Sequence, residues 1–252
     1  MFKIKQLAKP QIKNPILIEG LPGIGNVGKI CVDFIIDNIQ AKKFLEIYSS
    51  YLPSSVFVNE ENLIDLPKIG LYYKKLKSGD LILLSGDVQP IDEIGCYGLC
   101  YKILDIFEKL KGKEIITLGG IGLSKIPQNP KVYCTANNRE IIKKYKTKDL
   151  NNKIFGVVGP IIGVTGLLVG LAEQRKIPAI TLLAQTFAHP TYLGIKGSKE
   201  ILSILNKKLK LDMNLSTLNK EIKNIEIEIR TKTQKLTEFK GWDKKQETSY
   251  IG

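Results

Sequence analysis

The chain has 252 residues, of which 43% are hydrophobic and 25% are charged. A chain of this length can bury a sizeable core without disulfides or metal ions, and its composition excludes a disordered or collagen-like protein. Lysine and arginine outnumber aspartate and glutamate by 38 to 25, which gives a net charge of +13.

The cations are almost all lysines, because only residues 139, 175 and 230 are arginines. Base and phosphate recognition favours the bidentate guanidinium of arginine. The lysines are also spread along the chain and are not interleaved with aromatic residues. The composition therefore indicates a solvated, lysine-rich surface. Binding of nucleic acid through these lysines is the weakest of three hypotheses for the function.

The N-terminal fifteen residues carry charges throughout and contain no apolar run, so we expect no signal peptide and a cytoplasmic protein. Cys96 and Cys100 can share one face of a helix, but no third or fourth ligand stands at metal spacing from them. We therefore expect the cysteines to be small buried residues and expect no metal site.

Strands and helices alternate along the chain. Short apolar runs bounded by glycine, proline or polar residues predict strands at 15–20, 44–48, 55–58, 63–66, 71–74, 81–85, 115–118, 132–135 and 178–184. Helical periodicity predicts helices at 27–39 and 93–110 and a further helix that ends near Arg175. This alternation predicts an α/β fold, a three-layer sandwich around a mostly parallel sheet, with a small meander inserted at 55–74.

Residues 154–172 form an uncharged segment of 19 residues, which is close to the length of a membrane span. Six glycine and proline residues interrupt it, so it is better explained as a strand, a glycine turn and the start of a buried helix, and we expect no contact with a membrane. Gly163, Gly166 and Gly170 fall on one face of that helix. We expect them to allow close packing against a second copy of the chain.

Residues 213–236 differ from the preceding α/β domain at 1–212. Leucine and isoleucine residues from Leu215 to Leu236 follow the three–four spacing of a heptad seam. The seam predicts an amphipathic C-terminal helix that packs on its own domain or on a partner subunit. Residues 237–252 are polar, and we expect a flexible tail.

A glycine-rich motif at 20–29 follows a predicted strand and precedes a predicted helix. Its glycines satisfy the dinucleotide-binding fingerprint, in which backbone N–H groups at a helix start hold a phosphate. It nearly satisfies the P-loop pattern as well, but Ile30 stands where a magnesium-binding serine or threonine is needed. The alternative is a tight turn with a purely structural role. The candidate ligand-binding residues here are Gly23, Gly25, Asn26, Gly28 and Lys29.

Asp87 and Gln89 extend this candidate site, because they follow a buried strand at the sheet edge where α/β proteins bind ligands. Asp87 can act as a catalytic carboxylate or can cap the following turn. No residue supplies it with a matched acid or base, and nothing in the sequence joins the single histidine, His189, to a nucleophile. We assign no catalytic residue and no cofactor.

Several segments in order resemble the archaeal members of the proteasome assembly chaperone family. They are residues 19–29 (EGLPGIGNVGK), 51–58 (YLPSSVFV), 86–90 (GDVQP), 117–122 (TLGGIG) and 163–171 (GVTGLLVGL). The resemblance implies an α/β domain with a layout like that of nucleoside phosphorylases, which self-associates and assists the assembly of proteasome α-subunits. It implies no cofactor and no catalytic residues.

The sequence thus favours a homo-oligomeric protein, a trimer or a larger ring, that binds proteasome α-subunits. The rival hypothesis is an enzyme or sensor that binds a nucleoside or a phosphorylated metabolite at Gly23–Lys29. Trp242, Tyr250 and Ile251 are candidate partner-binding residues in the tail. Proteins that dock on the α-ring often end in a hydrophobic residue, a tyrosine and any residue, and this chain departs from that pattern by ending in Ser249-Tyr250-Ile251-Gly252.

Overall fold

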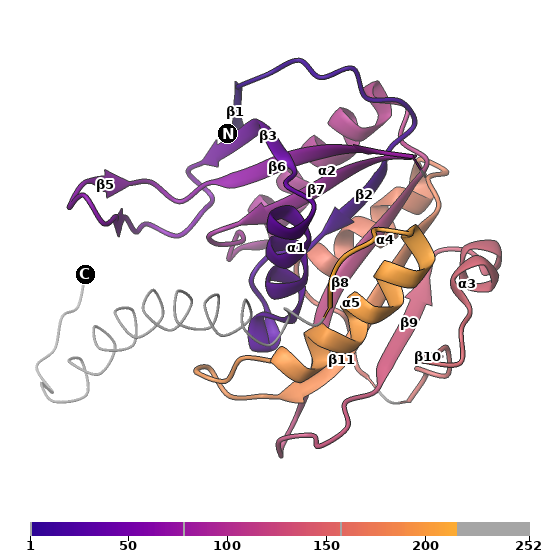
Figure 1. The fold of residues 1–252 in the computed structure, drawn as a ribbon. Coiled ribbons are helices and arrows are strands. Elements are labelled where there is room, and N and C mark those ends of the chain that lie inside the picture. The colour runs from indigo at the N-terminus through magenta and orange to yellow at the C-terminus, as the bar shows by residue number, and fades with distance from the viewer. Residues whose placement is uncertain (1, 78, 157, 216–252) are drawn as a thin grey trace, which may run out of the picture.

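A computed structural model describes residues 2–77, 79–156 and 158–215. Within them the main sheet has nine strands (Figure 1): β1 (Phe2–Gln6), β2 (Ile16–Glu19), β3 (Lys42–Ser49), β6 (Ile69–Leu76), β7 (Gly79–Gly86), β8 (Glu114–Leu123), β9 (Val132–Ala136), β10 (Leu150–Asn151) and β11 (Ala179–Phe187). A separate two-stranded sheet consists of β4 (Phe57–Val58) and β5 (Ile64–Asp65). The helices are α1 (Val27–Asn38), α2 (Glu93–Lys109), α3 (Arg139–Tyr145), α4 (Val164–Gln174) and α5 (Ile195–Leu209), and the 3-10 turn η1 (Ile24–Asn26) precedes α1.

The main sheet runs in the order β1-β3-β6-β7-β2-β8-β11-β9-β10. Its central strands β7, β2, β8 and β11 are all parallel to their neighbours in that group. The strands on the β1 side pair antiparallel, and so do β11 and β9. The predicted three-layer α/β sandwich is confirmed, but its sheet is more mixed than predicted, because β1, β3, β6 and β9 enter it by antiparallel pairing.

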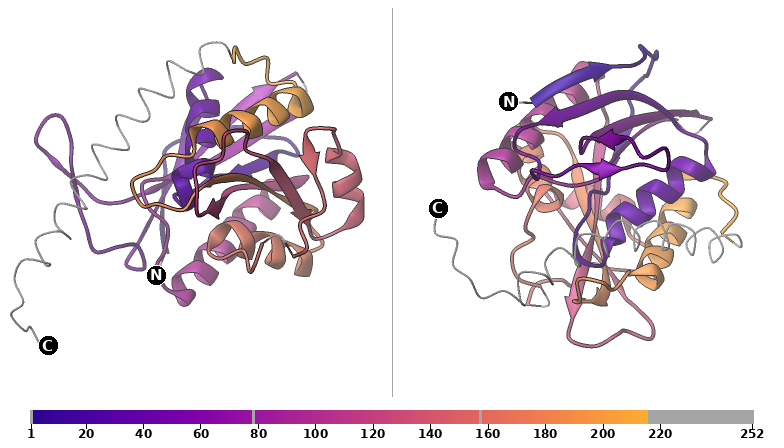
Figure 2. Two further views of the ribbon diagram at one scale, coloured as in Figure 1. Left: turned by 90° about the horizontal axis from the view of Figure 1, so that it is seen from below. Right: turned by 90° about the vertical axis from the view of Figure 1, so that its left-hand side faces the viewer.

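Helices cover both faces of the sheet, as the two views in Figure 2 show. α1 and α5 pack together on one face, and α2 and α4 pack together on the other. Successive residues of β2 divide between these layers, since Leu17 belongs to the α2/α4 core and Ile18 to the α1/α5 core. A central strand buried on both faces needs a continuous apolar run, and this is the sequence pattern that identified it.

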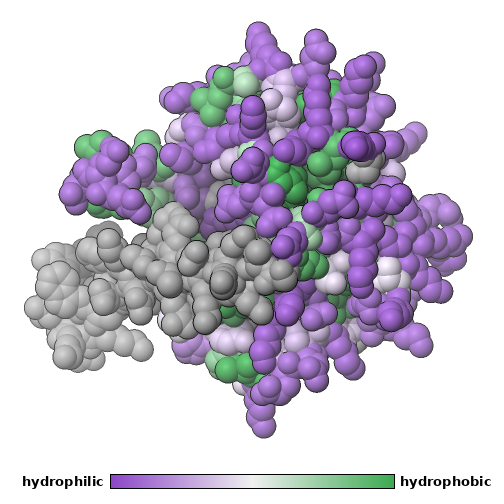
Figure 3. All heavy atoms as spheres, in the orientation of Figure 1, coloured by the Kyte–Doolittle hydropathy of each residue, from purple (hydrophilic) through white to green (hydrophobic). Residues whose placement is uncertain are grey.

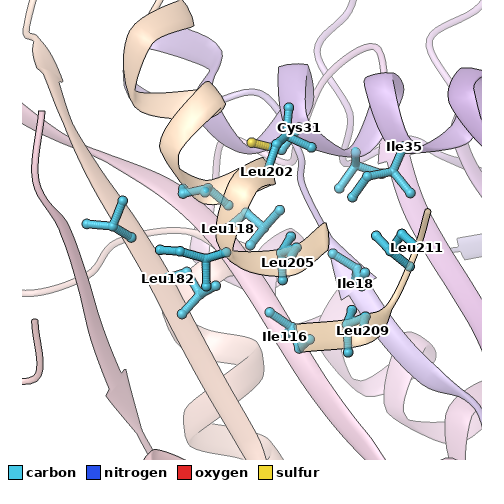
Figure 4. Packing of buried hydrophobic residues seen from close by; sticks show 14 of the residues in the cluster. Ile18, Cys31, Ile35, Ile116, Leu118, Leu182, Leu202, Leu205, Leu209 and Leu211 are labelled. Atoms are coloured by element: carbon cyan, nitrogen blue, oxygen red, sulfur yellow. The ribbon is translucent and has the colours of Figure 1, made fainter. Parts of the chain in front are cut away.

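The α1/α5 core is assembled from distant parts of the chain (Figure 4). Cys31 of α1, Leu205 of α5 and Leu118 of β8 are all fully buried in it. Ser198 of α5 joins the two helices, because its hydroxyl donates to the backbone oxygen of Val27 at 3.2 Å. Helix α5 therefore fixes the position of the start of α1.

Two glycines allow α1 to approach the sheet closely. A Cβ atom on Gly28 would overlap the backbone oxygen of Leu118 in β8, and one on Gly20 would overlap the backbone oxygen of Gly28. Backbone therefore meets backbone where α1 crosses the ends of β2 and β8. Any larger residue at either position would push the helix away from the strands.

The structure differs from the sequence prediction in several elements. β1, α3, β10 and α5 were not predicted, whereas the predicted strands at 55–58 and 63–66 form β4 and β5 outside the main sheet. In the uncharged segment 154–172, the predicted strand is reduced to a single bridge between Phe155 and Val158, and the predicted helix is α4. No helix among the described residues has the length and apolarity needed to span a membrane.

The predicted C-terminal helix and tail lie almost entirely outside the described residues. Of residues 213–236, only the first three are described, and they are not helical. Met213 is buried against the α1/α5 core, and Leu215 packs beside it. The predicted tail at 237–252, with Trp242, Tyr250 and Ile251, lies wholly outside the described part of the chain.

Candidate functional site

A cleft of about 1150 Å³ opens beyond the carboxyl ends of the parallel strands β2, β7 and β8. After β2 the chain enters α1 on one face of the sheet, and after β7 it enters α2 on the other. Loops that leave neighbouring parallel strands toward opposite faces create the crevice in which α/β proteins bind ligands. The cleft is lined by residues from four segments, 21–28, 89–97, 118–122 and 158–170, and by Leu183 of β11.

The glycine-rich motif forms the first wall of this cleft. Gly25 has a φ of +61°, and a Cβ atom there would lie 2.6 Å from Oγ1 of Thr186. Its carbonyl accepts a hydrogen bond of 2.8 Å from the backbone N–H of Gly194, the residue before α5. Asn26 also has a left-handed backbone, with a φ of +51°. The motif is thus held by its own backbone conformation and by contacts with β11 and α5.

Gln89 bridges two walls of the cleft. Its Nε2 donates to the backbone oxygen of Pro22 at 2.6 Å, and its Oε1 accepts from the backbone N–H of Val164 at 3.4 Å. One side-chain amide therefore connects the turn after β2 to the first residue of α4. Gln89 lines the cleft, as the sequence predicted for a residue of this site.

Asp87 and Lys29 have partners outside the cleft lining. The backbone N–H of Lys68 donates to Oδ2 of Asp87 at 3.3 Å, which ties the end of β7 to the start of β6. Lys29 forms an ion pair with Asp33 one turn along α1 at 2.7 Å, and Asp33 also accepts a hydrogen bond from Ser85. Of the seven candidate ligand-binding residues, only three line the cleft: Gly23, Gly28 and Gln89.

The lining of the cleft is apolar and acidic. Ile91 and Ile162 are among its members and are 80% and 86% exposed. Among the described residues that line it, the only charged side chains are Asp92 and Glu93, and Asp92 caps α2 by accepting from the backbone N–H of Gly95 at 2.6 Å. Phosphate sites combine backbone N–H groups with cations, so this lining suits apolar groups better than a nucleotide.

Glu19 is fully buried directly behind the cleft wall. Its Oε1 accepts from the backbone N–H of Leu21 at 2.9 Å, whereas Oε2 is buried and makes no hydrogen bond within the described residues. Burial raises the pKa of Glu19 to about 7, although the Leu21 N–H and the nearby Thr165 hydroxyl act in the opposite direction. Leu21 and Thr165 both line the cleft. Glu19 directly precedes the glycine-rich motif in the sequence, but the sequence did not indicate that it is buried.

The thiols and the histidine do not form a catalytic pair in the described structure. Cys31, Cys100 and Cys134 are buried, and burial raises the pKa of each thiol, to about 11 for Cys134. His189 stacks on Phe187 at 5.6 Å, and its Nδ1 is 3.0 Å from the hydroxyl of Thr191. No group of three metal-ligating side chains occurs among residues 2–215 that are described.

The three glycines of the predicted packing stripe have different surroundings. A Cβ atom on Gly166 would overlap the backbone oxygen of Ile161, and one on Gly163, which has a φ of +84°, would lie 2.8 Å from Oε1 of Gln89. The space beside Gly170 is open, and Gly170 lines the cleft. Contacts within the chain therefore account for glycine at 163 and 166, and contact of the stripe with a second copy stays a prediction.

We expect Gly25→Ala to lower the free energy of unfolding by about 2 kcal/mol, because alanine is strained at positive φ and its methyl group would collide with Thr186. Gly23→Ala is the matched control, since the φ of Gly23 is extended and no atom lies within 4 Å of an added Cβ. Urea unfolding with and without ATP measures both. Wild-type stability of Gly25→Ala together with loss of nucleotide binding would contradict a structural role for the turn.

We expect Glu19→Gln to become more stable relative to the wild type as the pH rises from 4.5 toward 8. The folded state holds the Glu19 proton up to about pH 7, whereas the unfolded chain releases it near 4.5. This contribution to stability is present below pH 4.5 and is lost as the pH rises to 7, a change of roughly 3 kcal/mol. Urea unfolding of both proteins across this range tests it, and a constant difference between them would show that Glu19 ionises normally.

Comparison with known proteins identifies relatives that match nearly the whole chain. The uncharacterised protein MJ1210 of Methanocaldococcus jannaschii is 30% identical over 232 residues, which are 90% of this chain and 88% of the relative. The crystal structure of PbaB, an archaeal proteasome activator from Pyrococcus furiosus, has 31% identity and a TM-score of 0.81 over 91% of this chain and 98% of PbaB.

PbaA of Pyrococcus furiosus, an archaeal homologue of proteasome-assembly chaperone, shares the fold. Its TM-score is 0.77 over 95% of this chain and 100% of PbaA, with 22% identity. The sequence model of the PAC2 family matches residues 17–232, which include β2 through α5 and all four segments of the cleft. The predicted resemblance is therefore confirmed, and the chain belongs to the PAC2 family.

Proposed function

We propose that this protein is a proteasome assembly chaperone-like factor that binds proteasome α-subunits as a homo-oligomer, a trimer or a larger ring, in the cytoplasm and without catalysis. The observation that carries the proposal is the likeness to PbaB, which extends over 98% of that archaeal proteasome activator. A partner-binding role also agrees with the buried, weakly acidic thiols and with the engagement of Asp87 and Lys29 in structural contacts.

The rim of the cleft is the surface proposed to contact the α-subunits. We define the cleft rim as Ile91, Ile94, Tyr97 and Ile162, which are 45% to 86% exposed. Adjacent exposed isoleucine and tyrosine side chains are typical of protein interfaces, because aromatic and large aliphatic groups bury most apolar area on a partner. Asp92 and Glu93 lie between the two isoleucines and would give the rim an acidic border.

We expect the double variant Ile91→Ser/Ile94→Ser to bind α-subunits at least tenfold more weakly, because it removes the two most exposed apolar groups of α2 and its approach. Ile126→Ser is the control, because Ile126 is also an exposed isoleucine, at 49%, and lies outside the cleft lining. Capture of α-subunits of the same organism on immobilised full-length protein measures both variants. Equal capture by the rim variant and the wild type would place the binding surface elsewhere.

The tail is proposed as a second contact, through Trp242, Tyr250 and Ile251. Their side chains lie outside the described residues, and the proposal rests on their aromatic and apolar character in an otherwise polar segment. Deletion of residues 248–252 is expected to lower the affinity for α-subunits or for the assembled core particle. Unchanged affinity would leave the α/β body as the binding surface and would refute the tail contact.

A further inference from the structure

The two-stranded sheet of β4 and β5 projects from the body of the protein. It lies in the arm, which we define as residues 53–67, between β3 and β6. Figure 1 shows the arm extending away from the main sheet, and the left view of Figure 2 shows it standing apart from the helices. Within the described parts of the chain, β4 and β5 pair with each other and with no other strand, at Phe57 with Asp65 and Val58 with Ile64.

The arm exposes several large apolar side chains to water. Five of its large apolar side chains are 51% to 70% exposed: Val56, Val58, Leu63, Ile64 and Leu66. Green patches on the projecting arm in Figure 3 show this surface. An isolated two-stranded hairpin is at best marginally stable in water. The arm therefore has the properties of a segment that is covered by another surface.

The charge of the arm is opposite to that of the rest of the chain. It contains three carboxylates and no lysine or arginine, whereas the whole chain carries +13. Asp65 pairs with Lys68 at 3.6 Å, but Glu60 and Glu61 at the tip are exposed and form no ion pair with any described residue. An acidic tip is attracted to a basic surface, and a second copy of this chain provides one.

A groove of about 880 Å³ at the base of the arm fits that tip. Its lining is mainly apolar and hydroxyl-bearing, with Leu52, Val56 and Leu66 among its members, and Lys3 is the only charged side chain among the described residues that line it. Lys3 is exposed and forms no ion pair among the described residues. The groove thus offers both an apolar floor and an unpaired cation to a tip that carries Glu60 and Glu61 and is followed in the sequence by the exposed Leu63 and Ile64.

We propose that two copies of this chain associate by exchanging arms, with the tip of each arm in the groove at the base of the other. This deepens the self-association in the proposed function, on which it rests. The exchange occupies the arm and the groove of both copies, so it joins chains in pairs, and a larger ring then contains an even number of copies held by a second contact between pairs. Arm and groove lie on the same part of the chain, so the contact is self-complementary, as two-fold symmetry requires. Together they comprise about 20 residues, which is the number that a standard interface places on each partner.

A charge exchange across the interface tests the proposal. In Lys3→Glu, three carboxylates would meet at each contact, and in Glu60→Lys/Glu61→Lys, three lysines would meet there. We expect each variant alone to dissociate at least tenfold more readily than the wild type. An equimolar mixture of these two variants places opposite charges at both contacts. The triple variant Lys3→Glu/Glu60→Lys/Glu61→Lys does the same by itself. Both samples are therefore expected to regain wild-type association. Sedimentation velocity at several concentrations measures each case at low and high salt.

Removing the apolar contact tests the proposal independently of charge. Val58→Ser/Ile64→Ser is expected to weaken association at least tenfold, whereas Ile91→Ser/Ile94→Ser, at the cleft rim, is expected to leave it unchanged. Both pairs are exposed, and circular dichroism verifies that each variant is folded. The same samples are assayed for α-subunit capture.

The outcomes separate the interface from the proposed function. A wild-type chain that remains a monomer of about 28 kDa at micromolar concentration would refute self-association and the arm exchange together. Arm variants that associate normally and still capture α-subunits would overturn the arm exchange alone. Arm variants that associate normally but lose capture would assign the arm to the α-subunits, which also overturns the exchange.

Discussion

The close contact of the α1 backbone with β2 and β8 determines the geometry of the glycine-rich motif and of the cleft beside it. Gly20 and Gly28 remove the side chains that would separate helix from sheet, and the motif at 23–26 must then turn within very few residues. The tight turn requires the left-handed backbone of Gly25. It is held by contact with Thr186 of β11 and by the hydrogen bond from Gly194, the residue before α5. Close packing of α1 on the sheet thus accounts for Gly20 and Gly28 in a motif that resembles a phosphate-binding loop. The turn between them forms one wall of the cleft.

Charge is distributed unevenly over this basic protein. The carboxylates of the cleft lining and of the arm tip gather in two places where cations are scarce, while lysines cover much of the remaining surface. Apolar side chains are exposed in the same two places. Apolar groups with an acidic border can bind partners without attracting polyanions, which a uniformly basic surface would collect. The two surfaces therefore agree with protein partners better than with nucleic acid.

The sequence predicted the parallel centre of the fold because buried strands such as β2 and β7 are continuous apolar runs. It did not predict β1, because the alternating lysines of this segment are typical of a polar chain terminus. The pairing with β3 that makes it a strand involves residues 45–49, far along the chain. Helix α5 has apolar residues at helical spacing, so its signal was present and was missed. Nor can spacing reveal that Asp87 bonds to Lys68, 19 residues earlier, or that Glu19 is buried near Thr165 of α4 and Cys100 of α2. Local pattern identifies elements, whereas partners across the fold decide what a polar side chain does.

The amide of Gln89 has a consequence for how the cleft can receive a partner. The amide joins Pro22 to Val164, so the length of one side chain sets the distance between these two walls of the cleft. Moving these two segments apart would break at least one of the two hydrogen bonds. The cleft therefore has a preformed shape where Gln89 bridges its walls. A preformed cleft loses little conformational entropy when a partner of matching shape binds. A partner that is too wide for this part of the cleft is excluded by steric clash rather than by charge.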